Sequence, residues 1–156
     1  MIRVILAASL LATCAPALAD RPDPRFAGAW RIEGAVLAPW ATREQGFPDE
    51  VKHLVGQRVV FAAAAVGAPS PLGCAGPRYR VREADGPEML FEGGLAGSDG
   101  PPPNDPAARA RALGMTGSTV QTLEVGCSDI AYHAIRPGVL MFALDNQVYT
   151  LRRRPR

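Results

Sequence analysis

The chain has 156 residues, with 17 Lys or Arg and 15 Asp or Glu, so its formal net charge is +2 at pH 7. This length allows one domain with a sizeable core, and so balanced a charge gives no electrostatic case for nucleic acid binding, which needs a concentrated basic face. Lys52 is the one lysine, and Ala, Gly and Pro are abundant, which is typical of a GC-rich bacterial genome.

The start of the chain has the pattern of a secretory signal. A positively charged beginning is followed by an apolar run, Val4–Ala12, and by the small residues of Ala17-Leu18-Ala19. This order predicts a signal peptide over residues 1–19 and a single periplasmic or secreted domain over residues 20–156. The apolar run is too short for a transmembrane helix. Because Leu11-Ala12-Thr13-Cys14 resembles a lipoprotein cleavage box, a form anchored at Cys14 stays open as an alternative.

Cys74 and Cys127 are the cysteines that remain after removal of the predicted signal peptide. Two cysteines in an oxidising compartment are expected to pair. A disulfide that closes a loop of about 50 residues would stabilise the fold by roughly 4 kcal/mol. A metal or thiolate pair lacks nearby histidines, so we expect a structural disulfide.

Strand signals dominate the beginning of the domain. Trp30, Ile32 and Val36 share one face of a period-2 pattern, which predicts a half-buried strand. Helix-start and helix-stop signals around Pro48–Gly56 predict a short helix. A second strand is expected from Gln57 to about Ala65.

Turn residues divide the middle of the chain. Arg78–Arg82 alternates between arginines and apolar residues, which predicts a strand. Asp85-Gly86-Pro87 predicts a turn into a further strand, Glu88–Phe91, so that the two strands would form a hairpin. Residues 93–104 are rich in Gly and Pro and are expected to form a loop.

The last third of the chain begins with a helix signal. Asp105-Pro106 has the residues of a helix start and Gly114 those of a helix end. Three or four strands are expected to follow, and Asp145-Asn146 suits a tight hairpin turn between two of them. These strands are Thr119–Val125, Ile130–Ile135, Val139–Leu144 and Val148–Leu151. The whole pattern predicts an all-β fold, an antiparallel barrel of seven or eight strands with one or two short helices.

The two ends of the domain resemble those of a known family. Gly28-Ala29-Trp30 opens the first strand, and Tyr149-Thr150-Leu151-Arg152 lies in the last strand. This arrangement resembles the Gly-x-Trp signature of lipocalins and other calycin barrels, in which an arginine from a late strand crosses the Trp ring. The resemblance implies a calycin-like barrel with Arg152 or Arg153 over Trp30, where the charge gains from the π face. Another small barrel or sandwich, or a mixed α+β fold, stays open.

The resemblance also implies an apolar small molecule inside the barrel. The residues expected to line its site are Trp30, Tyr79, Met89, Phe91 and Tyr132. Trp40 is expected at the barrel mouth, either as a lid that contacts the ligand or as a plug at the edge. A barrel of this size can instead be filled by its own side chains.

The chain carries no recognisable catalytic or metal-binding motif. His53 and His133 are its two histidines, and a shared metal site would need further ligands. The serine in Gly97-Ser98-Asp99-Gly100 lacks the strand-to-helix setting of a nucleophile elbow. Asp49-Glu50 suits the start of a helix. We therefore expect no enzyme, no cofactor and no metal.

Two functions are consistent with the sequence. The first is a monomeric exported protein of the bacterial envelope that binds a small apolar ligand without catalysis. The second is a protein-binding module, such as an inhibitor of an envelope-directed hydrolase, that acts through residues 93–104. The basic segment Arg152–Arg156 is expected to be a solvated tail or a contact for acidic lipid or polysaccharide.

Overall fold

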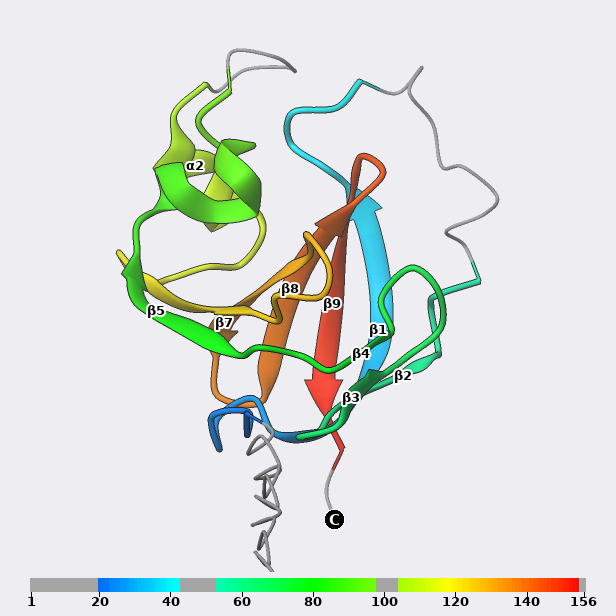
Figure 1. Cartoon of the computed structure of the whole chain (residues 1–156). Coiled ribbons are helices and arrows are strands. Elements are labelled where there is room, and N and C mark those ends of the chain that lie inside the picture. Colours follow the sequence, from blue (N-terminus) through cyan, green and yellow to red (C-terminus); the bar gives the residue numbers. More distant parts are fainter. Residues whose placement is uncertain (1–19, 43–52, 98–103, 155–156) are drawn as a thin grey trace, which may run out of the picture.

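One antiparallel sheet dominates the computed structural model, which describes residues 20–42, 53–97 and 104–154 (Figure 1). Within these residues the sheet has nine strands in the order β4-β3-β2-β1-β9-β8-β7-β6-β5 and curls into a half-barrel. The strands are β1 (Gly28–Leu37), β2 (Arg58–Phe61), β3 (Ala65–Gly67), β4 (Cys74–Ala75), β5 (Arg80–Asp85), β6 (Val120–Glu124), β7 (Ala131–Arg136), β8 (Val139–Leu144) and β9 (Gln147–Arg153). The predicted all-β antiparallel fold is confirmed, and the short β3 and β4 raise the strand count above the predicted one.

The first strand follows the predicted alternation only over its first half. Trp30 and Ile32 are buried, but the register of β1 against β9 shifts between Ile32 and Gly34. Such a bulge inverts the faces of the residues that follow it. Val36 is therefore 52% exposed, and its predicted inward orientation is wrong.

A tight hairpin joins β8 to β9. Asp145 and Asn146 form its two-residue connection, and their φ angles are 48° and 61°. Two consecutive positive φ values are the mark of the type I′ turn, whose twist matches that of paired strands. The turn predicted at this dipeptide is confirmed. β9 then pairs with β1, so the first and last strands of the sheet are neighbours in space.

The predicted hairpin after β5 is wrong. Instead of a strand, Pro87–Gly93 forms a 3-10 segment, η2, and β5 pairs with β6. The proline at the start of η2 has no N–H to give to a ladder, while the N–H of Met89 donates to the carbonyl of Gly86. Phe91 and Glu92 then have φ angles of 52° and 57°, which end any extended run.

The predicted second helix is confirmed as α2 (Pro106–Ala112). Asp105 caps it, because its carboxylate accepts the backbone N–H groups of Ala107 and Ala108. The helix predicted over Pro48–Gly56 lies mostly outside the described residues. None of the described helices is long and apolar enough to cross a membrane.

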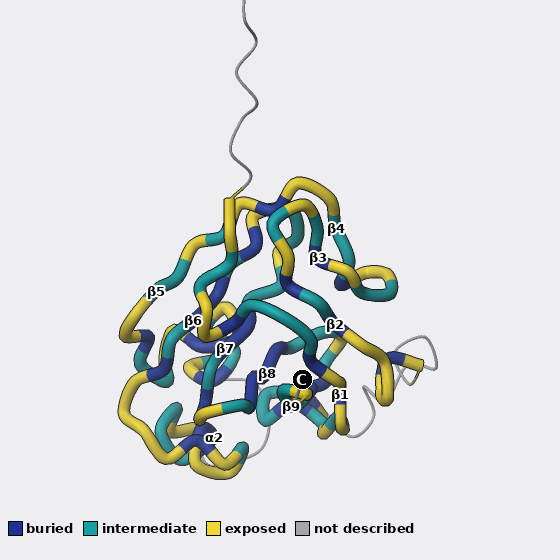
Figure 2. Tube along the Cα trace, turned by 90° about the horizontal axis from the view of Figure 1, so that it is seen from below, coloured by how far each residue is buried: buried dark blue, intermediate teal, exposed yellow. Residues whose placement is uncertain are grey.

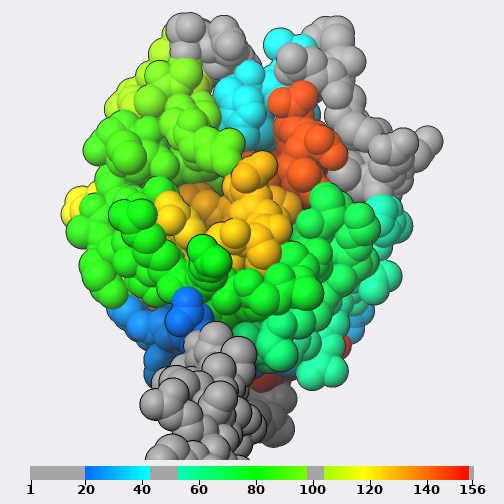
Figure 3. Space-filling view, in the orientation of Figure 1, coloured from blue at the N-terminus to red at the C-terminus, as the bar shows by residue number. Residues whose placement is uncertain are grey.

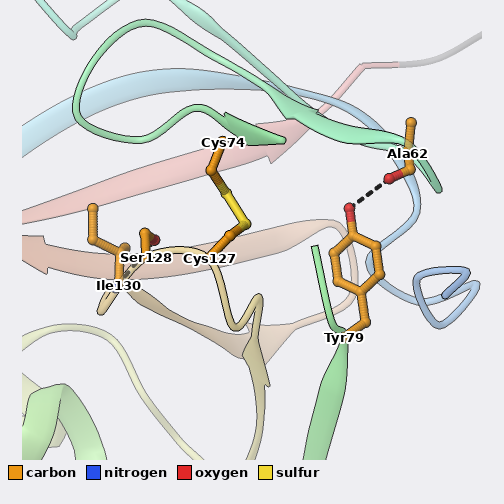
Figure 4. The surroundings of a disulfide bond; sticks show 6 residues. All are labelled: Ala62, Cys74, Tyr79, Cys127, Ser128 and Ile130. Atoms are coloured by element: carbon orange, nitrogen blue, oxygen red, sulfur yellow. Dashed lines mark hydrogen bonds between the residues drawn. A yellow bond between two sulfur atoms is a disulfide. The ribbon is translucent and has the colours of Figure 1, made fainter. Parts of the chain in front are cut away.

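The half-barrel is open between its edge strands, since the described residues form no ladder between β4 and β5. The disulfide between Cys74 of β4 and Cys127, in the connection from β6 to β7, lies across this gap (Figure 4). Beside it the hydroxyl of Tyr79 donates to the carbonyl of Ala62 at 2.7 Å. In the space-filling view this connection, coloured gold, fills the space between the two green edges (Figure 3). The predicted disulfide is confirmed, and it joins two parts of the sheet that no ladder connects.

Two hydrophobic clusters lie on opposite faces of the central strands. Along β8, Leu140 and Phe142 belong to the cluster inside the curl, whereas Val139 and Met141 belong to the second cluster. This period-2 alternation with both faces buried explains why β8 has four consecutive buried residues. η2 lies against β5 and β7 and is in contact with α2, which places it over the second cluster. Figure 2 shows buried segments on the central strands and exposed ones mainly at the turns.

Candidate functional site

The end of the half-barrel near the first residues of β1 has the contact that the resemblance implied. The guanidinium carbon of Arg153 lies 4.4 Å from the centroid of the Trp30 ring. Trp30 is 1% exposed, and its Nε1 donates to the carbonyl of Phe26 at 2.7 Å. The Arg153 guanidinium also donates to the carbonyls of Arg25 and Ala27. Of the two arginines predicted for this position, Arg153 occupies it, and its contacts are structural ones.

The interior of the curl is filled by aromatic side chains. Tyr132 lies edge-on to Phe61, with ring centroids 4.8 Å apart, and packs against Phe142 at 5.5 Å. Phe142 stacks on Tyr149 at 4.8 Å. The hydroxyl of Tyr132 has no hydrogen-bond partner among the described residues, and burial raises its pKa. These contacts form a packed core around the residues that were expected to line a ligand site.

An open hollow lies on the opposite face of the sheet, between η2 and the β8–β9 turn. Its volume is about 380 Å³, and we call it the aromatic hollow. It is lined by Trp40, Phe91, Glu92, Gly94, Asp129, Ile130, Ala131, His133, Ala143, Leu144, Asp145 and Asn146. Trp40 and Phe91 form its apolar wall, with ring centroids 5.7 Å apart and planes inclined by 41°.

His133 of β7 holds the backbone of this wall in place. Its Nε2 accepts the backbone N–H of Phe91 at 3.1 Å, so the proton of the neutral ring lies on Nδ1. Nδ1 lies 3.0 Å from the hydroxyl oxygen of Thr122, to which it donates. His133 is fully buried, and this burial lowers its pKa to about 4. The histidine is therefore neutral at pH 7, which the bond to Phe91 requires.

The backbone beneath the aromatic hollow is strained. Phe91 and Glu92 are both in the left-handed region, which costs a residue with a Cβ about 1–2 kcal/mol. Gly94 follows, and a Cβ at that position would lie 3.0 Å from two ring carbons of Trp40. The segment thus turns the Phe91 ring and the Trp40 ring toward each other at a conformational cost that the His133 bond offsets.

The rim of the aromatic hollow is acidic. Glu92, Asp129 and Asp145 line it, and no arginine or lysine is among its described lining residues. A second open hollow of about 640 Å³, the acidic hollow, shares Glu92 and Asp129 with the first. Its other charged lining residues are Arg82, Glu88 and Glu124. Arg82 is already paired with Asp85 at 2.9 Å and Glu124 at 2.6 Å. This surface therefore favours a cation.

The structure brings together only some of the residues that were predicted to bind the ligand. Trp40 and Phe91 lie in the aromatic hollow, and Met89, 52% exposed, lines the acidic hollow. Trp30 and Tyr132 are in the inner core, and Tyr79 packs against that core.

Sequence reasoning did not identify the acidic rim of the aromatic hollow. Its carboxylates lie far apart in the chain, and no local pattern connects them. From the sequence, His133 was predicted to be only an ordinary histidine on a strand. Within the described residues, no group of three or more His, Cys, Asp or Glu could hold a metal ion.

The fold and this surface define an antiparallel β half-barrel, compatible with a calycin-like fold, that has a filled interior and an outer aromatic hollow. No protein-family model, curated protein or solved structure matches the chain.

Proposed function

We propose that this is an exported, non-catalytic binding protein of the bacterial envelope that takes a small ligand with an apolar body and a positively charged group. The observation that carries the proposal is the pair of Trp40 and Phe91 beside a rim of three carboxylates, with no basic residue among the described residues of the lining. Aromatic faces and carboxylates together are the usual recognition elements for an organic cation. The disulfide of the described structure is in keeping with an exported protein.

The site lies outside the curl of the sheet, which departs from the calycin arrangement in which the ligand lies within the barrel. The packed rings around Tyr132 support this placement, because a ligand there would have to displace core side chains. The aromatic hollow needs no such rearrangement: its volume of about 380 Å³ is in the range of small-molecule sites. A relationship to lipocalins would then be one of fold and of the contact between Trp30 and Arg153.

Three probes of equal chain length test the charge and the apolar contact separately: the hexylammonium ion, hexanol and hexanoate. We expect quenching of tryptophan fluorescence with hexylammonium at the lowest concentration, with hexanol at a higher one, and with hexanoate weakest of all. Trp40→Ala should abolish uptake, which for this variant is measured by calorimetric titration because the substitution removes the tryptophan that reports on the hollow. Val36→Ala, an apolar truncation on the exposed side of β1, should leave it intact.

Asp129→Asn separates the two contributions, because it removes one rim charge and no apolar contact. It should bring the affinities for hexylammonium and hexanol closer together. If hexanol binds as well as hexylammonium to the unaltered protein, the ligand is purely apolar. If none of the probes binds, the proposal fails, and the protein-binding module becomes the better hypothesis.

A further inference from the structure

A row of arginines crosses three neighbouring strands near the start of β1. The register places Arg31 of β1 opposite Arg58 of β2 on one side and opposite Arg152 of β9 on the other. All three residues are exposed, whereas Trp30 and Ile32 on either side of Arg31 point inward. Adjacent strands are about 4.8 Å apart, so the arginine row spans only about 10 Å.

Two open hollows lie over this arginine row. Their volumes are about 540 and 610 Å³, and both are lined by Arg31, Arg153 and Arg154. Arg58 lines the first hollow, and Arg152 lines the second together with Glu33. Among the described lining residues, five arginines and one carboxylate thus carry a charge of +4, while the whole chain has +2.

Little in the described structure neutralises this charge. Glu33 accepts a hydrogen bond from Arg152 at 2.8 Å. Arg153 is held by backbone carbonyls and by the Trp30 ring, which leave its charge uncompensated. Arg31 and Arg58 form no ion pair with another described residue. Like charges directly opposite each other on paired strands are destabilising, so the arginine row opposes folding unless an anion lies on it.

We propose that this face binds a compact polyanion with two or more phosphate groups close together. Guanidinium groups bind phosphate through paired N–H donors, and a short row of them can engage neighbouring phosphates at once. The hollows favour a molecule that enters them over a flat lipid surface. Of the lining residues that the structure describes, Val55 alone is a large exposed apolar side chain that could enter a bilayer. The site is separate from the aromatic hollow and does not depend on the function proposed for it.

Calorimetric titration of the purified protein with inorganic tripolyphosphate at low salt tests this proposal. We expect saturable binding that weakens with added salt. Arg31→Gln and Arg58→Gln should each weaken it about tenfold or more, the effect of one charge-assisted hydrogen bond. Arg80→Gln is the matched control, since Arg80 is an exposed arginine at the far edge of the sheet, on β5. It removes the same charge and should leave the affinity within about twofold.

The thermal stability of the same variants without any anion gives a second readout. Because the row is self-repulsive, Arg31→Gln should leave Tm unchanged or raise it. A lower Tm for this variant would refute the mutual repulsion of the arginines. Absence of tripolyphosphate binding, or equal weakening of that binding by Arg80→Gln, would refute the proposed phosphate-binding site on the arginine row. Cosedimentation with vesicles of phosphatidylglycerol in the absence of tripolyphosphate binding would replace it with a membrane contact.

Discussion

Replacement of His133 by glutamine tests whether a buried neutral histidine limits the stability of this protein in acid. The pKa of His133 is lowered to about 4 by burial, against about 6.5 in an unfolded chain. Between these two values the unfolded chain binds a proton that the folded protein does not. Stability therefore falls as the pH drops from 6.5 to 4 and changes no further through this group below pH 4. The loss over the whole window is about 3 kcal/mol.

Urea unfolding at pH 7, 6, 5 and 4 measures this effect. Glutamine at position 133 can accept the N–H of Phe91 and donate to Thr122 without titrating, so the variant keeps both bonds. At pH 7 the variant should be somewhat less stable than the unaltered protein, because its side chain does not fill the space of the ring. At pH 4 the order should be reversed.

The pH dependence of the difference between the two proteins is the informative quantity. The charged groups that face His133 are Asp85, which favours its protonation, and Arg82, which opposes it. Both groups are present in the two proteins, so the difference in stability reports on His133 together with its interactions with Asp85 and Arg82. Parallel stability curves from pH 7 to pH 4 would refute the assignment of a strongly lowered pKa to His133.

Three further sets of substitutions test the disulfide, the strained segment at Phe91 and Glu92, and the contact of Arg153 with Trp30. Joint replacement of Cys74 and Cys127 by serine should lower the free energy of unfolding by about 4 kcal/mol, and reduction of the unaltered protein should have the same effect in urea titrations. Glu92→Gly should raise this free energy by about 0.5–1 kcal/mol, because glycine adopts positive φ freely, and should lower the affinity for hexylammonium through the lost carboxylate. Arg153→Ala should cost about 2 kcal/mol in chemical denaturation, whereas Arg154→Ala should change stability by less than about 0.5 kcal/mol.

The sequence predicted those elements whose structure depends on neighbouring residues. The α2 cap at Asp105 and the turn at Asp145-Asn146 follow from local hydrogen bonding and from the φ angles that short polar residues tolerate. The disulfide followed from the number of cysteines and from the predicted oxidising compartment. The position of an arginine over Trp30 followed from the family resemblance.

The predictions that failed concern features that depend on contacts between distant segments. Glu88–Phe91 was expected to form a strand, because nothing local indicates positive φ at Phe91. The bond that stabilises this conformation comes from His133, 42 residues further along the chain. The exposure of Val36 depends on a bulge in the pairing with β9. Local propensity accounts neither for the bond from His133 nor for the bulge in β1.

The two proposed sites depend on tertiary register even more strongly. Arg31, Arg58 and Arg152 form one row only because β1 pairs with β2 and β9 in one particular register, and a slip by one residue would turn an arginine inward. The basic segment Arg152–Arg156 was expected to be a solvated tail or a contact for acidic lipid or polysaccharide, while the family resemblance placed Arg152 in the last strand. The structure includes both Arg152 and Arg153 in β9.

The pairing of β1 with β9 also determines how far apart the two proposed sites lie. Trp40 follows the end of β1, beside the β8–β9 turn, whereas Arg31 lies near its start, beside the end of β9. β1 ends at Leu37 and Trp40 lies in the turn that follows, so only the six steps from Arg31 to Leu37 are extended. At about 3.3 Å per residue they correspond to roughly 20 Å. This exceeds the Debye length of about 8 Å at physiological salt, so the acidic rim and the arginine row can hold opposite charges without cancelling each other. A nearly neutral net charge thus conceals an acidic rim and an arginine row, and for this reason composition alone gave no indication of either proposed site.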